Sequence, residues 1–259
     1  MKVYNVIIKE TEQENHTPTL GSDEKSIAFS LGNESQLVSS DITAVFRDNI
    51  ITPVGPAADL ADLAVSVYTA DQIISREDEG YQGWSRHIRI HFPVANKELW
   101  DRVKTDLEDM LSFLSGDRWE LIFRERANSR SEQIPTTRNP NNITKVSLLS
   151  GGMDSLIGAI DQLEIKEKVA FVSHYKRGTE GSKQPKLIES LNTHYGNGSL
   201  FSFRFYVQPK QKHLLASKED TSRARSFLFL GLGLAVASAL GDTIELIIPE
   251  NGLISLNDE

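Results

Sequence analysis

The second half of the chain alternates apolar runs with amphipathic stretches. Strands are expected at 145–150, 169–174, 200–207 and 243–249. Between them the pattern predicts a helix that ends at about residue 166, a second at about 184–195 and a third at about 221–240. Strands that alternate with helices predict a parallel sheet with helices on both faces, whose ligands lie beyond the carboxyl ends of the strands.

The first half has a less regular rhythm and is predicted to be an α+β domain. Helices are expected at about 57–75 and at about 96–115, the second one ending at Gly116. Strands are expected at 2–9, 26–31, 43–52, 84–92 and 119–123.

Two groups of side chains in this half could be given a role, and both are interpreted as structural. His87 and His91 share one face of the expected strand 84–92 with Arg89 between them, which favours a solvated polar face over a metal pair. Trp84, Trp100 and Trp119 are interpreted as core residues rather than as a stacking platform.

Residues 127–144 contain two prolines, many Asn, Ser and Thr residues, and no apolar period. This composition is typical of a linker. We therefore expect an amino-terminal domain at 1–126 and a second domain at 145–259.

Composition excludes several classes of protein. The net charge of −8 lies entirely within residues 1–144, and an acidic chain is poorly suited to neutralising nucleic-acid phosphates. The absence of cysteine excludes a disulfide or a thiolate zinc site. The longest apolar run, about 14 residues, is too short for a bilayer, and the amino terminus has no signal-peptide pattern. We expect a cytoplasmic protein with no membrane and no direct nucleic-acid contact.

The segment Ser150-Gly151-Gly152-Met153-Asp154-Ser155 stands where an apolar strand gives way to a helix. The glycines allow a tight turn and a close approach of the backbone to a ligand. The first N–H groups of the helix and its dipole favour a phosphate or pyrophosphate. The two serines add hydroxyl groups, and the Asp154 carboxylate can hold a Mg²⁺ ion that bridges phosphate oxygens.

This loop is neither a Walker A motif, since no lysine follows the glycines, nor a G-x-G-x-x-G motif. It resembles the PP-loop of ATP pyrophosphatases, which split ATP into AMP and pyrophosphate. Three further segments, at 172–178, 222–229 and 248–257, resemble the 7-cyano-7-deazaguanine synthase (QueC) family, above all the longer QueC-like QatC proteins of bacterial anti-phage systems. The resemblance covers residues 145–259 and, more loosely, 60–125.

The resemblance implies a Rossmann-like PP-loop domain, with ATP and Mg²⁺ as cofactors, that adenylates 7-carboxy-7-deazaguanine or a related acid and passes it to ammonia or an amine. Loop 150–155 would hold the pyrophosphate end of ATP, with Val172 and Ser173 beside the nucleotide. Arg225 would act with Asp154 in catalysis by meeting phosphates or the acyl-adenylate. Substrate contacts would come from His174, Tyr175, Arg177, Glu250 and Asn251.

The family carries a zinc-binding cysteine cluster, which this sequence lacks, so no zinc is expected. The family pattern also continues past residue 259, and we expect the PP-loop domain to be incomplete at its carboxyl end. Two functions therefore stay open. One is a ligase that amidates a carboxylate in anti-phage defence, and the other is a non-catalytic ATP-binding subunit that works with partner proteins of a defence operon.

Overall fold

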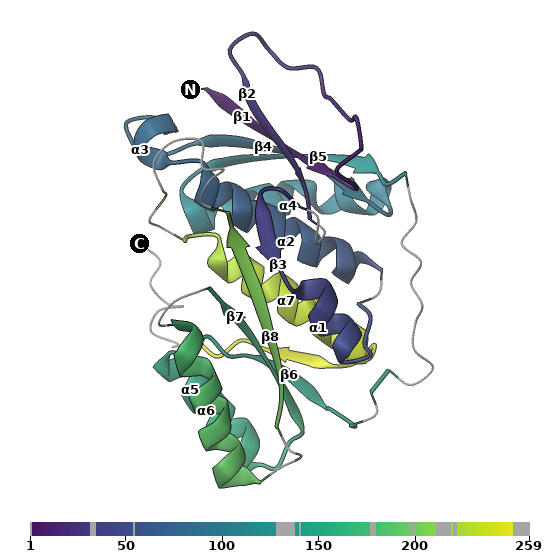
Figure 1. Ribbon diagram of the computed structural model, residues 1–259, viewed down its shortest axis with the longest axis vertical. Helices are drawn as coiled ribbons and strands as arrows, with labels where there is room; N and C mark the ends of the chain where they lie inside the picture. Colours follow the sequence, from purple (N-terminus) through teal and green to yellow (C-terminus); the bar gives the residue numbers. More distant parts are fainter. Residues whose placement is uncertain are drawn as a thin grey trace. The chain divides into compact units, whose positions relative to one another are not determined.

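The computed structural model shows an α/β protein with two sheets, and the labels in Figure 1 follow the order of elements along the chain. The structure describes residues 2–31, 35–53, 55–127, 138–139, 141–176, 180–196, 198, 200–210, 219 and 222–250.

The chain forms two compact units, and each unit is made of three separate stretches of the chain. The first unit comprises residues 1–40, 58–131 and 208–231, and the second comprises 41–57, 132–207 and 232–259. One crossing of the chain between the units, at residues 131–132, falls inside the linker predicted at 127–144. The segments 41–57 and 208–231 depart from the predicted division into two continuous domains. The first belongs to the second unit, and the second belongs to the first unit.

The first unit is built on a four-stranded sheet of order β2-β1-β4-β5, and all of its strands are parallel. The strands are β1 (Val3–Lys9), β2 (Lys25–Ser30), β4 (His87–Val94) and β5 (Arg118–Glu125). Parallel neighbours need long crossover connections. Here these are the loop 10–24, the helix α2 (Pro56–Ile73) and the helix α4 (Lys97–Ser115). The parallel sheet replaces the α+β arrangement expected for this half.

The ends of these helices follow the sequence closely. Asn96 caps α4, since its side chain accepts a hydrogen bond from the Leu99 N–H group. Gly116 ends the same helix at φ 73°, in the left-handed region that glycine adopts without strain. The helix α3 (Arg76–Glu79) was not predicted, and Trp84 lies in the turn before β4 with 62% of its surface exposed, so it is not a core residue. Trp100 and Trp119 are buried, as expected.

The second unit contains most of a five-stranded sheet of order β3-β8-β7-β6-β9. Its parallel strands are β6 (Lys145–Leu148), β7 (Val169–Tyr175), β8 (Leu200–Pro209) and β9 (Glu245–Ile247), and β3 (Val38–Ser40) adds a short edge. The four parallel strands are those that the sequence predicts. The segment 43–52, expected to be a strand, instead forms the helix α1 (Ile42–Asp48), in which Ile42, Val45 and Phe46 recur at helical spacing.

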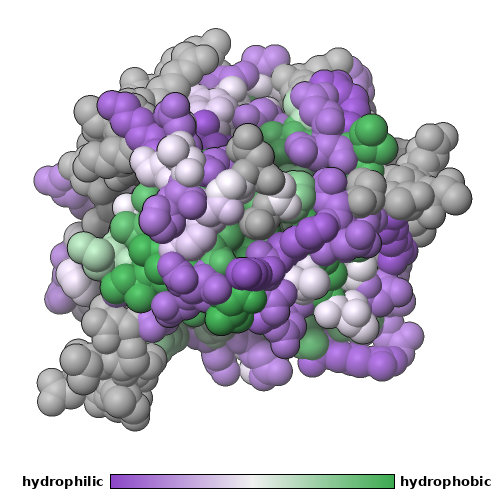
Figure 2. Space-filling model, turned by 90° about the horizontal axis from the view of Figure 1, so that it is seen from below, coloured by the Kyte–Doolittle hydropathy of each residue, from purple (hydrophilic) through white to green (hydrophobic). Residues whose placement is uncertain are grey.

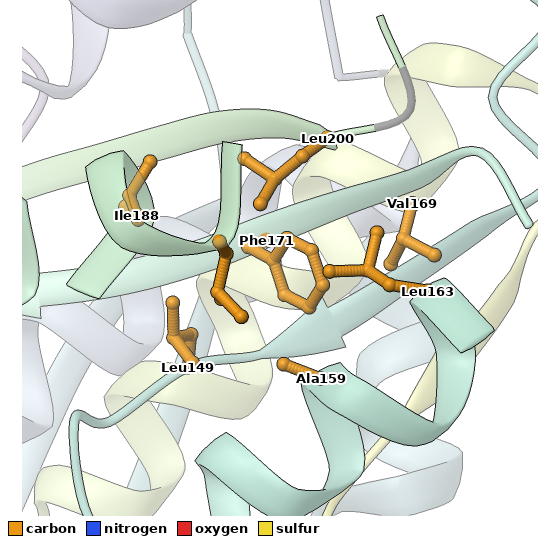
Figure 3. Packing of buried hydrophobic residues seen from close by; sticks show 8 residues of the cluster. Leu149, Ala159, Leu163, Val169, Phe171, Ile188 and Leu200 are labelled. Carbon is orange, nitrogen blue, oxygen red and sulfur yellow. The ribbon is translucent and has the colours of Figure 1, made fainter. Parts of the chain in front are cut away.

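Helices cover both faces of the second sheet. On one face α5 (Met153–Glu164) and α6 (Glu180–Tyr195) lie side by side, and they enclose a core around Phe171 (Figures 1 and 3). On the other face the later turns of α7 (Arg225–Leu240) pack so closely that a Cβ at Gly233 would lie 2.8 Å from the Leu148 side chain. None of the described helices is long and apolar enough to cross a membrane.

The two histidines of the polar face of the first sheet are buried rather than solvated, and the charged residues around them are half-buried in ion pairs. Arg89 Nε donates to Glu120 at 2.6 Å, and its Nη1 donates to Glu24 from the loop before β2 at 2.9 Å. His87 Nε2 lies 2.7 Å from the same Glu120 carboxylate. His87 and His91 are both more than nine-tenths buried, and within the described residues no group of three or more metal-ligating side chains forms.

This burial predicts a dependence of stability on pH. Desolvation, and then the charges of Arg89 and His16, lower the pKa of His91 from 6.5 to about 4. Between these two pH values the unfolded chain binds a proton at His91 and the folded chain does not. The contribution of the neutral His91 to the free energy of unfolding is therefore complete above pH 6.5 and is lost as the pH falls toward 4. We expect His91→Gln to flatten the fall in the free energy of unfolding between pH 6.5 and about 5, measured by urea denaturation.

His194→Gln, at an exposed position in α6, is the matched control and should keep the wild-type slope. An unchanged slope in His91→Gln would show that His91 does not carry the effect.

Candidate functional site

The loop 150–155 lies at the carboxyl end of β6, which pairs in parallel with β7 on one side and β9 on the other. Leu149 extends the pairing, since its N–H group donates to the Val172 carbonyl at 2.8 Å. Gly151 then turns the chain at φ 88°, and α5 begins at Met153. The sequence thus places the loop at the edge of the sheet where ligands of parallel α/β proteins bind.

Hydroxyl groups hold the loop in this shape. Ser155 Oγ accepts the Gly151 N–H group at 3.2 Å and donates to the Gly152 carbonyl at 2.9 Å. Ser150 Oγ accepts the Gly152 N–H group at 3.3 Å and donates to Ser155 Oγ at 3.1 Å. Ser155 is buried beneath the loop and Ser150 is exposed, so only Ser150 presents its hydroxyl to solvent.

The surface of the loop is open and carries groups suited to an anion with a metal ion. Gly151, Gly152, Met153 and Asp154 are all exposed, and no side chain caps α5. The first N–H groups of a helix have no acceptor within it, so those of Met153 and Asp154 are available to an anion at the positive end of the dipole. Among the described residues, no hydrogen bond or ion pair engages the Asp154 carboxylate.

Gln184 of α6 is a residue of this site that the sequence analysis missed. It is almost fully buried, and its Nε2 donates to the carbonyls of Ser150 and His174, each at 3.2 Å. Gly151 leaves room for it, because a Cβ at that glycine would lie 3.4 Å from Gln184 Cγ. Gln184 therefore joins the carboxyl ends of β6 and β7 under the loop.

A sequence signal for Gln184 exists. It precedes Ile188 and Leu191 by four and seven residues, the spacing of one helix face, and both of these side chains belong to the core of Figure 3. A polar residue at an inward position of an amphipathic helix must find a buried partner. Here the partners are two main-chain carbonyls.

The residues predicted at the end of β7 turn their side chains into the protein. Val172, Ser173 and His174 are fully buried. Ser173 Oγ donates to the Leu149 carbonyl at 2.9 Å, and His174 Nε2 lies 2.9 Å from the Val207 carbonyl. In this conformation a ligand at the sheet edge would meet their main chain, and the predicted contact through the His174 imidazole stays a prediction that requires the ring to move.

Tyr175 is the first partly exposed side chain after this run. Its hydroxyl donates to Asp41 Oδ2 at 3.4 Å, and the Arg204 guanidinium lies 4.7 Å from the centre of its ring. Asp41 also accepts the Tyr206 N–H group at 2.7 Å, and burial raises the pKa of its carboxyl group. Burial, followed by the charge of Asp41, raises the pKa of Tyr175 as well. Asp41 and Arg204 carry no motif signal, and the sequence analysis missed both.

The remaining predicted residues are distributed as follows. Glu250 is exposed, and it follows Pro249, which packs against α5 so closely that a Cβ at Gly158 would lie 2.7 Å from the proline ring. Arg225 belongs to the first unit, where its guanidinium lies 5.5 Å from the Phe229 ring. The predicted substrate residues Arg177 and Asn251 lie outside the described residues.

A groove of about 690 Å³ lies between α6 and β8, lined among others by Pro185, Ile188, Ser202 and Arg204. Its lining includes no residue of the loop 150–155. On α5 itself, Met153 is 70% exposed and Ile157 is 50% exposed. Figure 2 shows one face of the molecule, on which hydrophobic and hydrophilic residues are interspersed.

Comparison with protein-family models, with curated proteins and with solved structures returned no significant match. The class of protein that the fold defines is an α/β protein with a glycine-rich loop at the carboxyl ends of the parallel strands β6, β7, β8 and β9.

The two glycines of the loop predict different responses to a side chain. Gly151→Ala puts a Cβ on a residue at φ 88° and should destabilise the protein by about 1–2 kcal/mol. Gly152 has φ −84° and ψ 174°, which any residue adopts, and its nearest added contact is Ser150 Oγ at 3.5 Å. Gly152→Ala is therefore expected to leave stability within about 0.5 kcal/mol of wild type. Urea denaturation of the pair measures the difference, and equal stabilities would contradict the assignment of strain to Gly151 alone.

Proposed function

We propose that this chain binds Mg²⁺-ATP at the loop 150–155 and uses it to adenylate a carboxylate, with release of pyrophosphate. The observation that carries the proposal is the exposed Gly-Gly turn at the carboxyl end of β6, with Asp154 in the first turn of the uncapped helix α5. Backbone donors, a helix dipole and one free carboxylate are the groups that a pyrophosphate with its magnesium ion needs.

The hydrogen bonds of the loop indicate how the pyrophosphate would be held. The N–H groups of Gly151 and Gly152 are already bonded to serine hydroxyls, so they fix the turn. The donors left for an anion are the N–H groups of Met153 and Asp154 and the exposed hydroxyl of Ser150, which can rotate. Asp154 would hold the Mg²⁺ ion on the solvent side of the loop.

The chemistry needs few acid or base groups. A carboxylate is a poor electrophile because its leaving group would be an oxide, and attack on the α-phosphate of ATP converts that oxygen into AMP, a good leaving group. Catalysis then consists of neutralising charge and holding atoms in line. Arg225 is our candidate for the charge that grows on the α-phosphate, a role that rests on the family resemblance.

The resemblance also suggests the substrate class, which is a 7-carboxy-7-deazaguanine or a related deazapurine acid, with ammonia or an amine on a partner protein as the nucleophile. Partner proteins from an anti-phage operon belong to the same proposal. A chain that binds ATP but turns nothing over would instead act as a non-catalytic subunit of a defence complex.

The first test is binding. We expect isothermal titration calorimetry to show ATP binding in the presence of Mg²⁺, and we expect Gly152→Val to abolish it, because a branched side chain blocks the approach of phosphate to the backbone. Ile157→Ala, at an exposed position one turn along α5, is the control and should bind like wild type. Equal affinity in wild type and Gly152→Val would refute the site.

The second test identifies the bond that is cut. A loop that holds the leaving pyrophosphate predicts AMP and pyrophosphate as products. The loop lacks the lysine with which a P-loop holds the β- and γ-phosphates, so ADP and phosphate are not expected. Chromatography of nucleotides after incubation with 7-carboxy-7-deazaguanine and ammonia should show AMP, and Asp154→Asn should lower its rate on the order of a hundredfold. ADP as the main product would exclude the mechanism, and intact binding without any product would favour the non-catalytic subunit.

A further inference from the structure

The segment that leads into α7 is held by side chains from distant parts of the first unit. Glu219, Arg223 and Ala224 each contact a residue between 71 and 117, and all of these residues belong to that unit. These contacts are separated by about a hundred residues or more along the chain. They are therefore a product of tertiary folding and not of local helix geometry.

Glu219 is the first point of attachment. Its carboxylate accepts the Arg76 N–H group at 2.8 Å and lies 3.3 Å from Arg76 Nη1. The other end of the Arg76 guanidinium is held by Asp71 at 3.0 Å and Asp117 at 2.6 Å. Glu219 and Arg76 are both more than nine-tenths buried, so this ion pair is shielded from solvent and persists at physiological salt.

Arg223 is the second point. Its Nη1 donates to the Ser115 carbonyl at the end of α4 at 2.8 Å, and its guanidinium lies 4.4 Å from the centre of the Trp84 ring. Gly116 adjoins both, since a Cβ there would lie 3.2 Å from Arg223 Nη1 and 3.7 Å from Trp84 Nε1. The exposed Trp84 thus has a specific role, which is to cover the Arg223 guanidinium.

Ala224 is the third point, directly before α7. Its N–H group donates to Asp71 Oδ2 at 3.1 Å, so a carboxylate from α2 lies at the positive end of α7. Two turns further along, a Cβ at Gly231 would lie 2.6 Å from the Ala64 Cβ, which shows how closely the α7 backbone approaches α2. Arg225 is the first residue of α7, and the helix end that carries it is therefore fixed by contacts with residues outside the helix.

We propose that Asp71, Arg76, Trp84 and Ser115 form a clamp whose function is to fix the start of α7 and, with it, the direction of Arg225. These four residues are positioning residues, since they act through the start of α7. The clamp itself follows from the contacts above, and its consequence for catalysis rests on the proposed function. It gives residues 1–126 a task in the reaction, because they supply all four members.

Two variants loosen the clamp without emptying the core. Glu219→Gln removes one carboxylate but leaves Arg76 paired with Asp71 and Asp117, so no buried charge loses all its partners. Trp84→Leu uncovers Arg223 at a position that is already 62% exposed. Tyr81→Leu, in the same turn and also 62% exposed, is the control for the second variant.

The first measurement does not depend on activity. Hydrogen–deuterium exchange of the amides of residues 225–228 should become faster, on the order of tenfold, in Glu219→Gln and in Trp84→Leu, because local opening of the helix end costs less. The amides of β1 should exchange at the wild-type rate in both variants, and Tyr81→Leu should match wild type throughout. Unchanged exchange at 225–228 in both clamp variants would overturn the proposal.

The second measurement links the clamp to Arg225. In AMP formation both variants should lower kcat with little change in KM for ATP, and in an Arg225→Ala background they should cause no further loss. Faster exchange combined with wild-type kcat, or with losses that add to that of Arg225→Ala, would show that the clamp does not act through Arg225. If the wild-type chain forms no AMP, the proposed function fails while the exchange result still decides whether the clamp exists.

Discussion

The structure of the first unit depends on one buried guanidinium. Arg86 has no exposed surface, and it is held by Asp71 at 2.7 Å, by Asp117 at 2.6 Å and by the carbonyls of Asp71 and Ile74. A charge can be buried at tolerable cost only while its partners stay in place. The loss of one partner of a buried pair lowers the free energy of unfolding by about 3–5 kcal/mol. The same two carboxylates hold Arg76, so the end of α2, the start of β4 and the start of β5 are fixed together. Glu219 and Ala224 attach to this cluster, which is why the entry to α7 is defined from the amino-terminal part of the chain.

The second unit holds an open turn at the edge of its sheet through hydrogen bonds to main-chain groups of the turn. The serines on either side of the glycines bond to the N–H groups of the turn, and Gln184 bonds to two carbonyls beneath it. The acceptor atom of the same amide, Gln184 Oε1, is buried and has no partner among the described residues. Buried polar atoms are paired in the great majority of cases.

In the function proposed above, these arrangements would leave recognition of the nucleotide to the main chain more than to side chains. Val172, Ser173 and His174 direct their side chains inward, and Asp154 is the exposed acidic group of the loop. Adenylation, as proposed, needs phosphates to be neutralised and aligned, and main-chain N–H groups at a helix start can contribute to both. Arg225, the charged side chain that we propose for the reaction, stands on a helix whose start is held by buried ion pairs. Rigid support of that kind keeps a long side chain in one direction.

The sequence by itself determined what depends on near neighbours. The spacing of apolar residues predicted α2, α4 and the strands and helices after residue 145, and the Ser-Gly-Gly-x-Asp-Ser pattern predicted a tight turn between β6 and α5. Only the tertiary structure decided which way Trp84 faces, that His87 and His91 are buried, and that the first sheet is parallel. It also decided that 42–48 is a helix and that Gln184, Asp41 and Glu219 have hydrogen-bond partners far away in the chain. Periodicity and turns are encoded locally, whereas burial and charge pairing are set by segments that meet only after folding, and a polar residue looks the same in the sequence whether water or a buried partner will satisfy it.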